Sequence, residues 1–258
     1  MNLIEIIKHN NQLILNKEVS LAEVYGKENF CYLIYSLIKM QKPETIIELG
    51  TGLGTTALMI AQALKENNKG KIWTVDNGKD WEETKTSWIK TKFKTHEDYF
   101  NDVIKKFKLK KYIELLNINL DNNLFIDTGR KIDLVFCDAT DAGAMGCINL
   151  LKAYLPNMNT ESSIFIDRAS TINHSFLLLE KVINDLQNNK IPNILLNGLN
   201  KEDENNFIKF VSKSKFTLIH LTEKNDQKKN NKMQNSTAWI KIEPVDVFFQ
   251  KNVYNVIL

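Results

Sequence analysis

We predict from the sequence an α/β protein built on a doubly wound, mostly parallel seven-stranded sheet that ends in an antiparallel strand pair. From residue 43 onward, short apolar runs alternate with segments of helical periodicity, which indicates strand–helix–strand units. The apolar runs are nearly continuous, as is typical of parallel strands buried on both faces. The last two runs are separated only by a polar segment, residues 223–236, which leaves no room for a crossover helix. These two strands are therefore expected to pair antiparallel.

The expected elements follow one another in order along the chain. Residues 1–42 carry helical periodicity that Pro43 ends, and they are expected to form an N-terminal helical cap segment. Residues 43–258 are expected to form the domain that holds the sheet, and they contain no internal repeat. Strands are expected at 45–49, 71–75, 112–116, 132–137, 163–166, 216–221 and 238–242. Helices are expected at 55–65, 99–107, 148–154, 174–186 and 205–211.

The composition sets limits on function. With 258 residues, 43% hydrophobic and 25% charged, the chain resembles an ordinary globular protein. Its formal charge of +3 gives no electrostatic case for binding nucleic acid. No apolar run approaches membrane-spanning length and no signal segment is recognisable, so we expect a cytoplasmic protein with no membrane partner. The three cysteines show no zinc-site spacing and fit a reducing compartment.

A glycine-rich loop, residues 48–54 (E-L-G-T-G-L-G), joins the first expected strand to the following helix. Gly50, Gly52 and Gly54 allow a tight turn and let a ligand approach the backbone. Position 55 is Thr, so the spacing is G-x-G-x-G and not the G-x-G-x-x-G on which a pyrophosphate sits. The loop is Rossmann-like and suits a nucleotide-like ligand without a pyrophosphate; a glycine turn with no ligand is the alternative.

Two acidic residues accompany the loop. Glu48 lies two residues before the first glycine, at the carboxyl end of the first strand, where ligands of open α/β sheets bind. Asp76 ends the next strand, about twenty residues downstream, where a carboxylate can accept both hydroxyls of a ribose.

The run E-L-G-T-G-L-G-T-T together with Asp76 resembles the class I S-adenosylmethionine-dependent methyltransferases, and more closely their small-molecule O-methyltransferase branch. The resemblance covers residues 43 to 170 in order, and the last strand pair fits the hairpin with which that fold ends. It implies methyl transfer from S-adenosylmethionine to a small molecule, at oxygen. Asn119, in I-N-L-D, matches the family position near the adenine amine. The implied cofactor-binding residues are Glu48, Gly50, Thr51, Gly52, Gly54, Thr55, Asp76, Asn119 and Asp138.

Candidate catalytic residues follow the fourth and fifth expected strands. They are Asp138 and Asp167, with His174 as a candidate general base for a metal-free mechanism. In metal-dependent members of the family, two such Asp residues and an adjacent Asn bind a divalent cation such as Mg²⁺. Here Arg168 stands where that Asn is expected, and a guanidinium beside a dication is unfavourable. Two interpretations therefore stay open: Asp138 and Asp167 bind a cation, or Asp167 and Arg168 bind an acidic substrate or form ion pairs.

Several interpretations stay open. The insert from Asn77 to Trp88 carries Trp81 and Trp88, which either cover the ligand or pack on the flank of the sheet. The chain is either an active methyltransferase or a catalytically silent cofactor-binding scaffold or partner subunit. A nicotinamide-dependent oxidoreductase is a third interpretation, which the glycine spacing does not favour. The apolar N-terminal helices bury either against their own sheet or in a homodimer.

Overall fold

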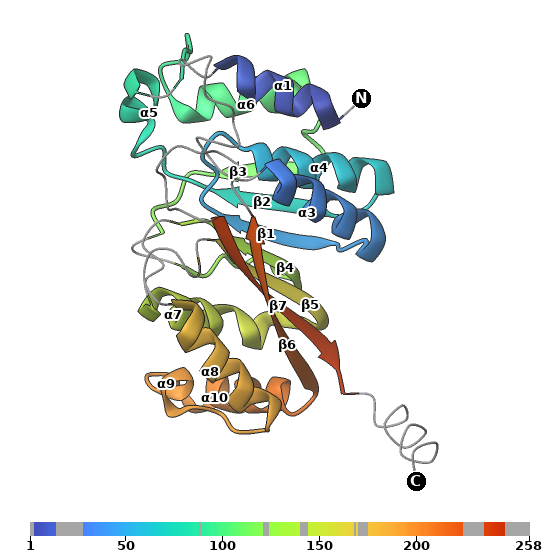
Figure 1. Ribbon diagram of the computed structural model, residues 1–258, viewed down its shortest axis with the longest axis vertical. Coiled ribbons are helices and arrows are strands. Elements are labelled where there is room, and N and C mark those ends of the chain that lie inside the picture. The colour runs from blue at the N-terminus through green and yellow to red at the C-terminus, as the bar shows by residue number, and fades with distance from the viewer. Residues whose placement is uncertain are drawn as a thin grey trace.

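The computed structural model describes residues 3–13, 28–87, 89–120, 124–139, 144–167, 169, 175–223 and 235–245. Within them, helices cover both faces of one seven-stranded sheet (Figure 1). The strands are β1 (Thr45–Leu49), β2 (Lys71–Val75), β3 (Ile113–Leu116), β4 (Ile132–Cys137), β5 (Met158–Asp167), β6 (Ser214–Glu223) and β7 (Asn235–Pro244). Their order in the sheet is β3-β2-β1-β4-β5-β7-β6. The α/β fold class that the sequence predicts is confirmed.

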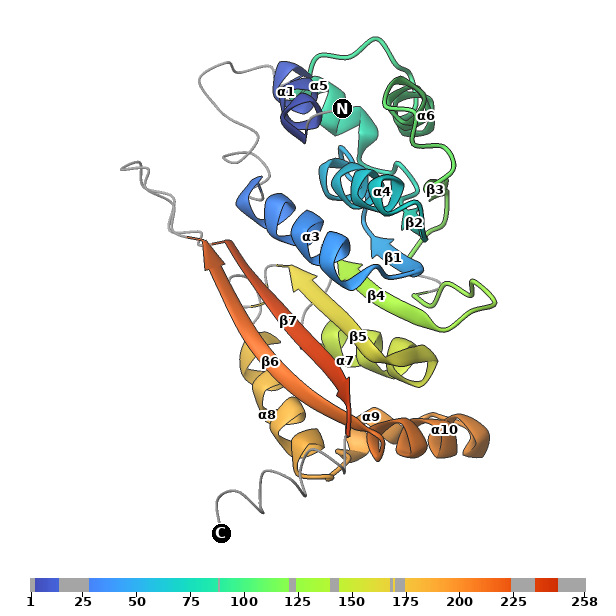
Figure 2. The same ribbon diagram turned by 90° about the vertical axis from the view of Figure 1, so that its right-hand side faces the viewer.

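The helices fall into two groups, one on each face of the sheet. The first group is α1 (Leu3–Leu13), α3 (Glu28–Gln41), α4 (Thr55–Asn67), α5 (Trp81–Ser87) and α6 (His96–Lys106). The second group is α7 (Ala144–Tyr154), η1 (Leu155–Asn157), α8 (Ser175–Gln187), α9 (Asn193–Leu196) and α10 (Lys201–Val211). Figure 2 shows the two layers on opposite sides of the strands. No helix in the described part of the chain is both long enough and apolar enough to cross a membrane.

The strands are buried because both faces carry apolar side chains. Ile46 on β1 and Phe136 on β4 belong to the core under α1, α3, α4 and α6. The neighbouring residues Ile47 and Val135 point to the other face and belong to the core under α7, α8 and α10. Every residue of β1 is buried. Covered faces on both sides explain why these strands are nearly continuous apolar runs in the sequence.

The sheet has a switch point between β1 and β4. From β1 the chain first moves outward through β2 to β3, and then returns to the other side of β1 with β4 and β5. β1 pairs in parallel with both neighbours, so Leu49 lies beside Val75 and beside Cys137. Ile166 of β5 lies beside Cys137 in turn. The residues that follow these strands therefore meet at one edge of the sheet, where ligands of such folds bind.

The last two strands confirm the expected antiparallel pair. β7 lies between β5 and β6 and runs antiparallel to both. Its register places Thr237 beside Asp167, the last residue of β5. The sheet edge that carries the candidate site thus receives residues from β7 as well as from the parallel strands.

Two parts of the chain differ from the sequence-based expectation. β5 begins at Met158, five residues before the expected strand: Met158 pairs with Ile132 of β4 and Ser162 with Ile242 of β7, while the polar residues between them give no apolar pattern. The insert after β2 contains the short helix α5, where the sequence predicts only a polar and aromatic segment. Trp81, its first residue, is buried and joins the core of that flank, which explains why this short helix is ordered there.

Candidate functional site

The three glycines of the loop all have positive φ angles, but each has different surroundings. At Gly50, with φ of 90°, a Cβ would lie 2.9 Å from the carbonyl oxygen of Asp138. At Gly54, with φ of 75°, it would lie 2.0 Å from Cε2 of Phe100. At Gly52, with φ of 52°, it would meet no described atom within 4 Å. Gly50 and Gly54 are therefore required by the packing of the protein itself, whereas Gly52 exposes its backbone to open space.

Asp76 holds the loop with its carboxylate. Its Oδ2 accepts the backbone N–H groups of Thr51 at 3.2 Å and Gly52 at 3.0 Å, and its Oδ1 accepts that of Gly78 at 2.8 Å. A carboxylate has about four acceptor positions, of which the described residues use three. The predicted ribose-binding acid thus lies directly against the glycine loop and retains capacity for one further donor.

Glu48 lies beneath the loop and is only 1% exposed. It accepts a hydrogen bond from the hydroxyl of Thr74, whose oxygen lies 2.6 Å from that of Thr51. Since Thr74 has a single proton and donates it to Glu48, Thr51 must donate to Thr74. Glu48 therefore stabilises the loop from below and presents almost no surface to a ligand.

The N-terminal helix α1 reaches the same loop. Asn10 is fully buried, and its Nδ2 donates to the hydroxyl of Thr55 at 2.7 Å. Thr55 is the first residue of α4, and its own hydroxyl proton stays available as a donor. Sequence analysis missed Asn10; the only signal was a polar residue on the helix face that also carries Ile6 and Ile7.

The predicted acidic residues after β4 and β5 lie at the same sheet edge. Asp138 is half-buried, and its N–H donates to the carbonyl of Leu49 at 2.8 Å, which places it beside the start of the loop. Asp167 is 9% exposed, and its Oδ1 accepts the hydroxyl of Thr237 at 3.2 Å. Asn119 is exposed after the end of β3. His174, Arg168 and Trp88 lie outside the described residues.

The metal interpretation finds no support in the side chains placed by the structure. Within the described ranges, no three His, Cys, Asp or Glu residues lie close enough together to hold a metal ion. Asp138 and Asp167 alone do not make such a site, and the hydroxyl of Thr237 already occupies one oxygen of Asp167. No step of the chemistry below involves a metal.

An aromatic cluster covers the flank of the loop. Trp81 is 5% exposed and stacks on Tyr99, with ring centroids 5.2 Å apart. The ring of His96 lies 5.4 Å from that of Trp81, and its Nε2 is 2.7 Å from the carbonyl oxygen of Gly52. The packed arrangement of Trp81 agrees with the interpretation that places it on the flank of the sheet. His96 is a contact of the loop that sequence analysis did not assign.

The described cysteines are not candidate nucleophiles. Cys31, Cys137 and Cys147 are all buried thiols that are not joined in disulfides. Burial raises the pKa of the Cys137 thiol to about 12 and raises that of Cys147 as well, so both stay protonated at neutral pH. They act as small core residues.

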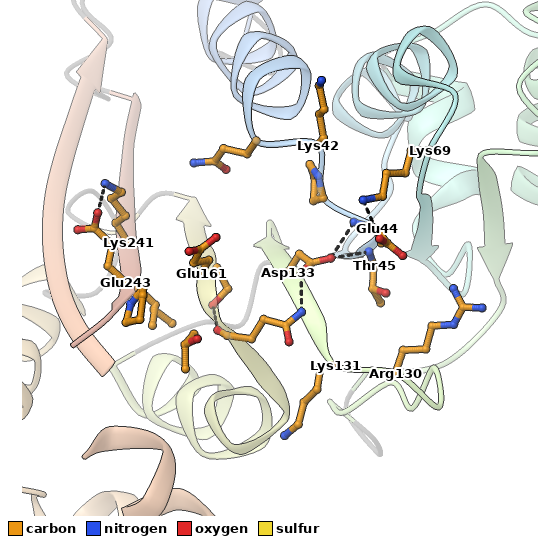
Figure 3. A pocket seen from close by; sticks show the side chains of 17 residues that line it. Lys42, Glu44, Thr45, Lys69, Arg130, Lys131, Asp133, Glu161, Lys241 and Glu243 are labelled. Atoms are coloured by element: carbon orange, nitrogen blue, oxygen red, sulfur yellow. Dashed lines mark hydrogen bonds and ion pairs between the residues drawn. The ribbon is translucent and has the colours of Figure 1, made fainter. Parts of the chain in front are cut away.

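A cavity of about 760 Å³ lies at the opposite end of the sheet (Figure 3). It is lined by the amino ends of β1 and β4, the first half of β5 and the carboxyl end of β7. Its charged side chains are largely engaged with one another, as in the ion pairs of Lys69 with Glu44 at 2.7 Å and of Lys241 with Glu243 at 2.6 Å. The cavity lies the length of β1, roughly 16 Å, from the glycine loop, so it is not part of the candidate site.

The comparisons with known proteins agree with this geometry. Residues 47–168 match a family model described as a methyltransferase domain, and this stretch contains the loop, Asp76, Asp138 and Asp167. No curated protein matches the chain in sequence.

Solved structures with the same fold include three methyltransferases. The chain is similar to the O-methyltransferase of Bacillus cereus in complex with SAH, with a TM-score of 0.52 and 13% identity over 93% of this chain and 89% of that one. It is similar to the O-methyltransferase TomG of Streptomyces achromogenes, involved in tomaymycin synthesis and in complex with SAM, with a TM-score of 0.50 and 13% identity over 93% and 90%. An SAH-bound methyltransferase of Podospora anserina gives a TM-score of 0.50 and 13% identity over 93% and 86%.

At these identities the structures establish the fold alone, and the family model covers less than half of the chain. The mostly parallel seven-stranded sheet and its last antiparallel strand pair are those that the sequence predicts, and the structure adds the strand order. Residues 47–168 therefore match a methyltransferase domain, and the chain has the fold of the solved methyltransferases to which it is similar.

Proposed function

We propose that the protein transfers the methyl group of S-adenosylmethionine to an oxygen atom of a small-molecule acceptor. One arrangement supports this most directly: the open face of Gly52 lies beside the Asp76 carboxylate, at the point where the strand order reverses. A nucleoside without a pyrophosphate suits a loop whose backbone is exposed at one glycine. The neighbouring carboxylate keeps an acceptor position for a ribose hydroxyl.

In this proposal the donor lies along the carboxyl ends of β1, β2 and β3. Asp76 accepts a ribose hydroxyl, and Asn119 contacts the adenine amine. Thr55 donates its hydroxyl proton to the methionine part of the donor, because its oxygen already accepts from Asn10. Glu48 contributes by holding Thr74 and Thr51 beneath the loop. The remaining residues that we assign to the donor site are Gly50, Gly52, Gly54 and Asp138.

The transfer itself is an in-line displacement. The C–S bond of the donor breaks as the new C–O bond forms, and the sulfonium sulfur keeps the electron pair to become the neutral thioether of S-adenosylhomocysteine. The acceptor hydroxyl gives its proton to a base of the protein, for which we propose Asp167 or His174. Asp138 borders both the donor loop and the edge with Asp167, so we assign it the orientation of the acceptor.

The acceptor class is inferred from chemistry and from similar folds. O-methyltransferases in complex with SAH or SAM share this fold, and the site combines a half-buried with a buried carboxylate at one edge.

The N-terminal cap segment, residues 1–42, contributes to the site through Asn10. The homodimer and the cytoplasmic location expected from the sequence stay predictions, which sedimentation velocity and cell fractionation will check.

Isothermal titration calorimetry with S-adenosylhomocysteine tests the donor site. We expect saturable binding by the wild-type protein, and titration with NADH as a control should give no heat of binding. If neither S-adenosylhomocysteine nor S-adenosylmethionine binds, the proposal is wrong.

Labelled methyl transfer tests the catalytic step. With radiolabelled S-adenosylmethionine and a panel of small hydroxylated acceptors, the wild-type protein should transfer label to at least one compound. Asp167→Asn keeps an oxygen that accepts from Thr237 but lacks the basicity of a carboxylate, so it should bind S-adenosylhomocysteine normally. Loss of transfer in this variant assigns the base to Asp167, and retained transfer assigns it to His174. Firm donor binding without transfer to any acceptor would instead support the catalytically silent scaffold.

A further inference from the structure

His96 is the histidine that the structure places against the glycine loop. It is the first residue of α6, is 6% exposed, and has its Nε2 2.7 Å from the carbonyl oxygen of Gly52. A carbonyl oxygen only accepts hydrogen bonds, so Nε2 must carry the proton and donate it. This contact joins residues 44 positions apart in the chain.

Gly52 is thereby held on both sides. Its N–H donates to Oδ2 of Asp76 at 3.0 Å, and its carbonyl accepts from His96. Both side chains belong to elements other than the loop itself. An exposed glycine with a positive φ angle and no side chain has wide conformational freedom. The two hydrogen bonds restrict that freedom at the one glycine of the loop that faces open space.

The ring of His96 is itself fixed in place. It stacks on Phe100 with centroids 6.0 Å apart, and its centroid lies 5.4 Å from that of the tilted Trp81 ring. A Cβ at Gly78 would lie only 3.0 Å from the Cβ of His96, so the loop after β2 also packs closely on this residue. His96 therefore cannot leave the Gly52 carbonyl without disturbing α5, α6 and the turn that carries Asp76.

We propose that His96 is a positioning residue of the donor site, an inference that rests on the proposed function. By donating from Nε2 to the Gly52 carbonyl, it fixes the orientation of the loop backbone before the donor binds. A loop ordered in advance loses less conformational entropy on binding, which raises the affinity for the donor. His96 need not touch the donor or take part in proton transfer.

Two substitutions separate this role from simple packing. His96→Gln keeps an N–H donor that reaches about as far as Nε2, whereas His96→Phe keeps an aromatic ring and removes the donor. Calorimetry with S-adenosylhomocysteine should show a Kd about tenfold higher for His96→Phe, and a Kd for His96→Gln within about threefold of wild type. Phe93→Leu is the matched control, because Phe93 packs on Tyr99 in the same cluster and its only described hydrogen bond goes to Thr91. It should lower the thermal midpoint and leave the Kd unchanged.

The outcomes distinguish this inference from the proposed function. A wild-type protein that does not bind S-adenosylhomocysteine refutes the proposed function, and the inference with it. If the wild-type protein and His96→Phe bind S-adenosylhomocysteine equally well, the inference alone is refuted. It is also refuted if the loss of affinity follows the loss of thermal stability in all three variants. NMR of isotope-labelled histidine in the wild-type protein adds a test that needs no variant. The His96 ring must be protonated at Nε2, and an unprotonated Nε2 would overturn the proposal.

Discussion

Replacing Gly54 by Ala tests whether the loop is shaped by the core as well as by its ligand. Gly54 has a φ angle of 75° and precedes the first turn of α4. A methyl group at this position would lie 2.0 Å from Cε2, 2.9 Å from Cδ2 and 3.0 Å from Cζ of Phe100. Phe100 is fully buried and stacks on His96, so its ring cannot move aside cheaply. Either α4 or α6 must shift.

The loss of stability that we expect for Gly54→Ala has two parts, one from the backbone and one from packing. A left-handed backbone angle costs an alanine roughly 1–2 kcal/mol, of which about 0.4–1 kcal/mol is recovered because alanine restricts the unfolded chain. Overpacking against a buried ring costs roughly a further 1–3 kcal/mol. The sum predicts that Gly54→Ala lowers the free energy of unfolding by about 1–5 kcal/mol, against a typical total of about 5–15 kcal/mol.

Gly129→Ala is the matched control for this measurement. Gly129 has a φ angle of 66° and is exposed, and an alanine methyl at this position would have no described atom within 4 Å, so it reports the backbone cost alone. Urea unfolding should show a loss of about 1 kcal/mol or less for Gly129→Ala and a clearly larger loss for Gly54→Ala. Adding Phe100→Leu to Gly54→Ala should recover part of that difference as a coupling energy. If the two alanine variants unfold at the same urea concentration, the argument from Phe100 is wrong.

Three further predictions follow from contacts elsewhere in the structure. Asp76→Ala removes the acceptor of three loop N–H groups and should weaken S-adenosylhomocysteine binding at least about tenfold in calorimetry; unchanged affinity would contradict the assigned role. Asp133 accepts the N–H groups of Glu44 and Thr45 with its Oδ2 (Figure 3), at the end of β1 far from the glycine loop. Asp133→Ala should therefore lower the free energy of unfolding in urea by about 1–3 kcal/mol, while calorimetry shows an unchanged affinity for the donor. Burial and the neighbouring Lys106 lower the pKa of His9 below 6.5 in the folded protein. The His9 ring therefore binds a proton more readily in the unfolded chain, so the protein should lose stability as the pH falls through 6.5. The urea midpoint should therefore change less between pH 7.5 and pH 5.5 in His9→Gln than in the wild type; both pH values lie about one unit from 6.5. An equal change in the two proteins would show that His9 does not contribute to this pH dependence.

The sequence predicted most of the sheet because burial leaves a local pattern. The strands 45–49, 71–75 and 132–137 have the predicted bounds, since each is an apolar run bounded by polar or glycine residues. The early start of β5 was missed because residues 159–162 are polar, although Met158 pairs with β4 and Ser162 with β7. Periodicity reports burial, and it gives no signal where a strand is held by backbone pairing alone.

The site was predictable only in part for a related reason. The positions of the glycine loop and Asp76 follow from local spacing, and Asp76 lies against the loop as expected. The contacts that shape the loop, from His96 and Asn10, join residues more than 40 positions apart. Nothing in the local sequence distinguishes either residue from an ordinary polar position, because its role depends on which helix packs beside the loop.

The three glycines show why a motif alone does not define a binding site. Gly50 and Gly54 are required because Asp138 and Phe100 leave no room for a side chain, and both would be required in a protein that bound nothing. Gly52 has space, and its backbone is instead held by Asp76 on one side and His96 on the other. The protein thus holds in place the one part of the loop that its own packing leaves open. Ordering the backbone at Gly52 loses conformational entropy and fills no void in the core. A ligand that binds the ordered backbone gains affinity from it, which explains why the protein restricts this residue.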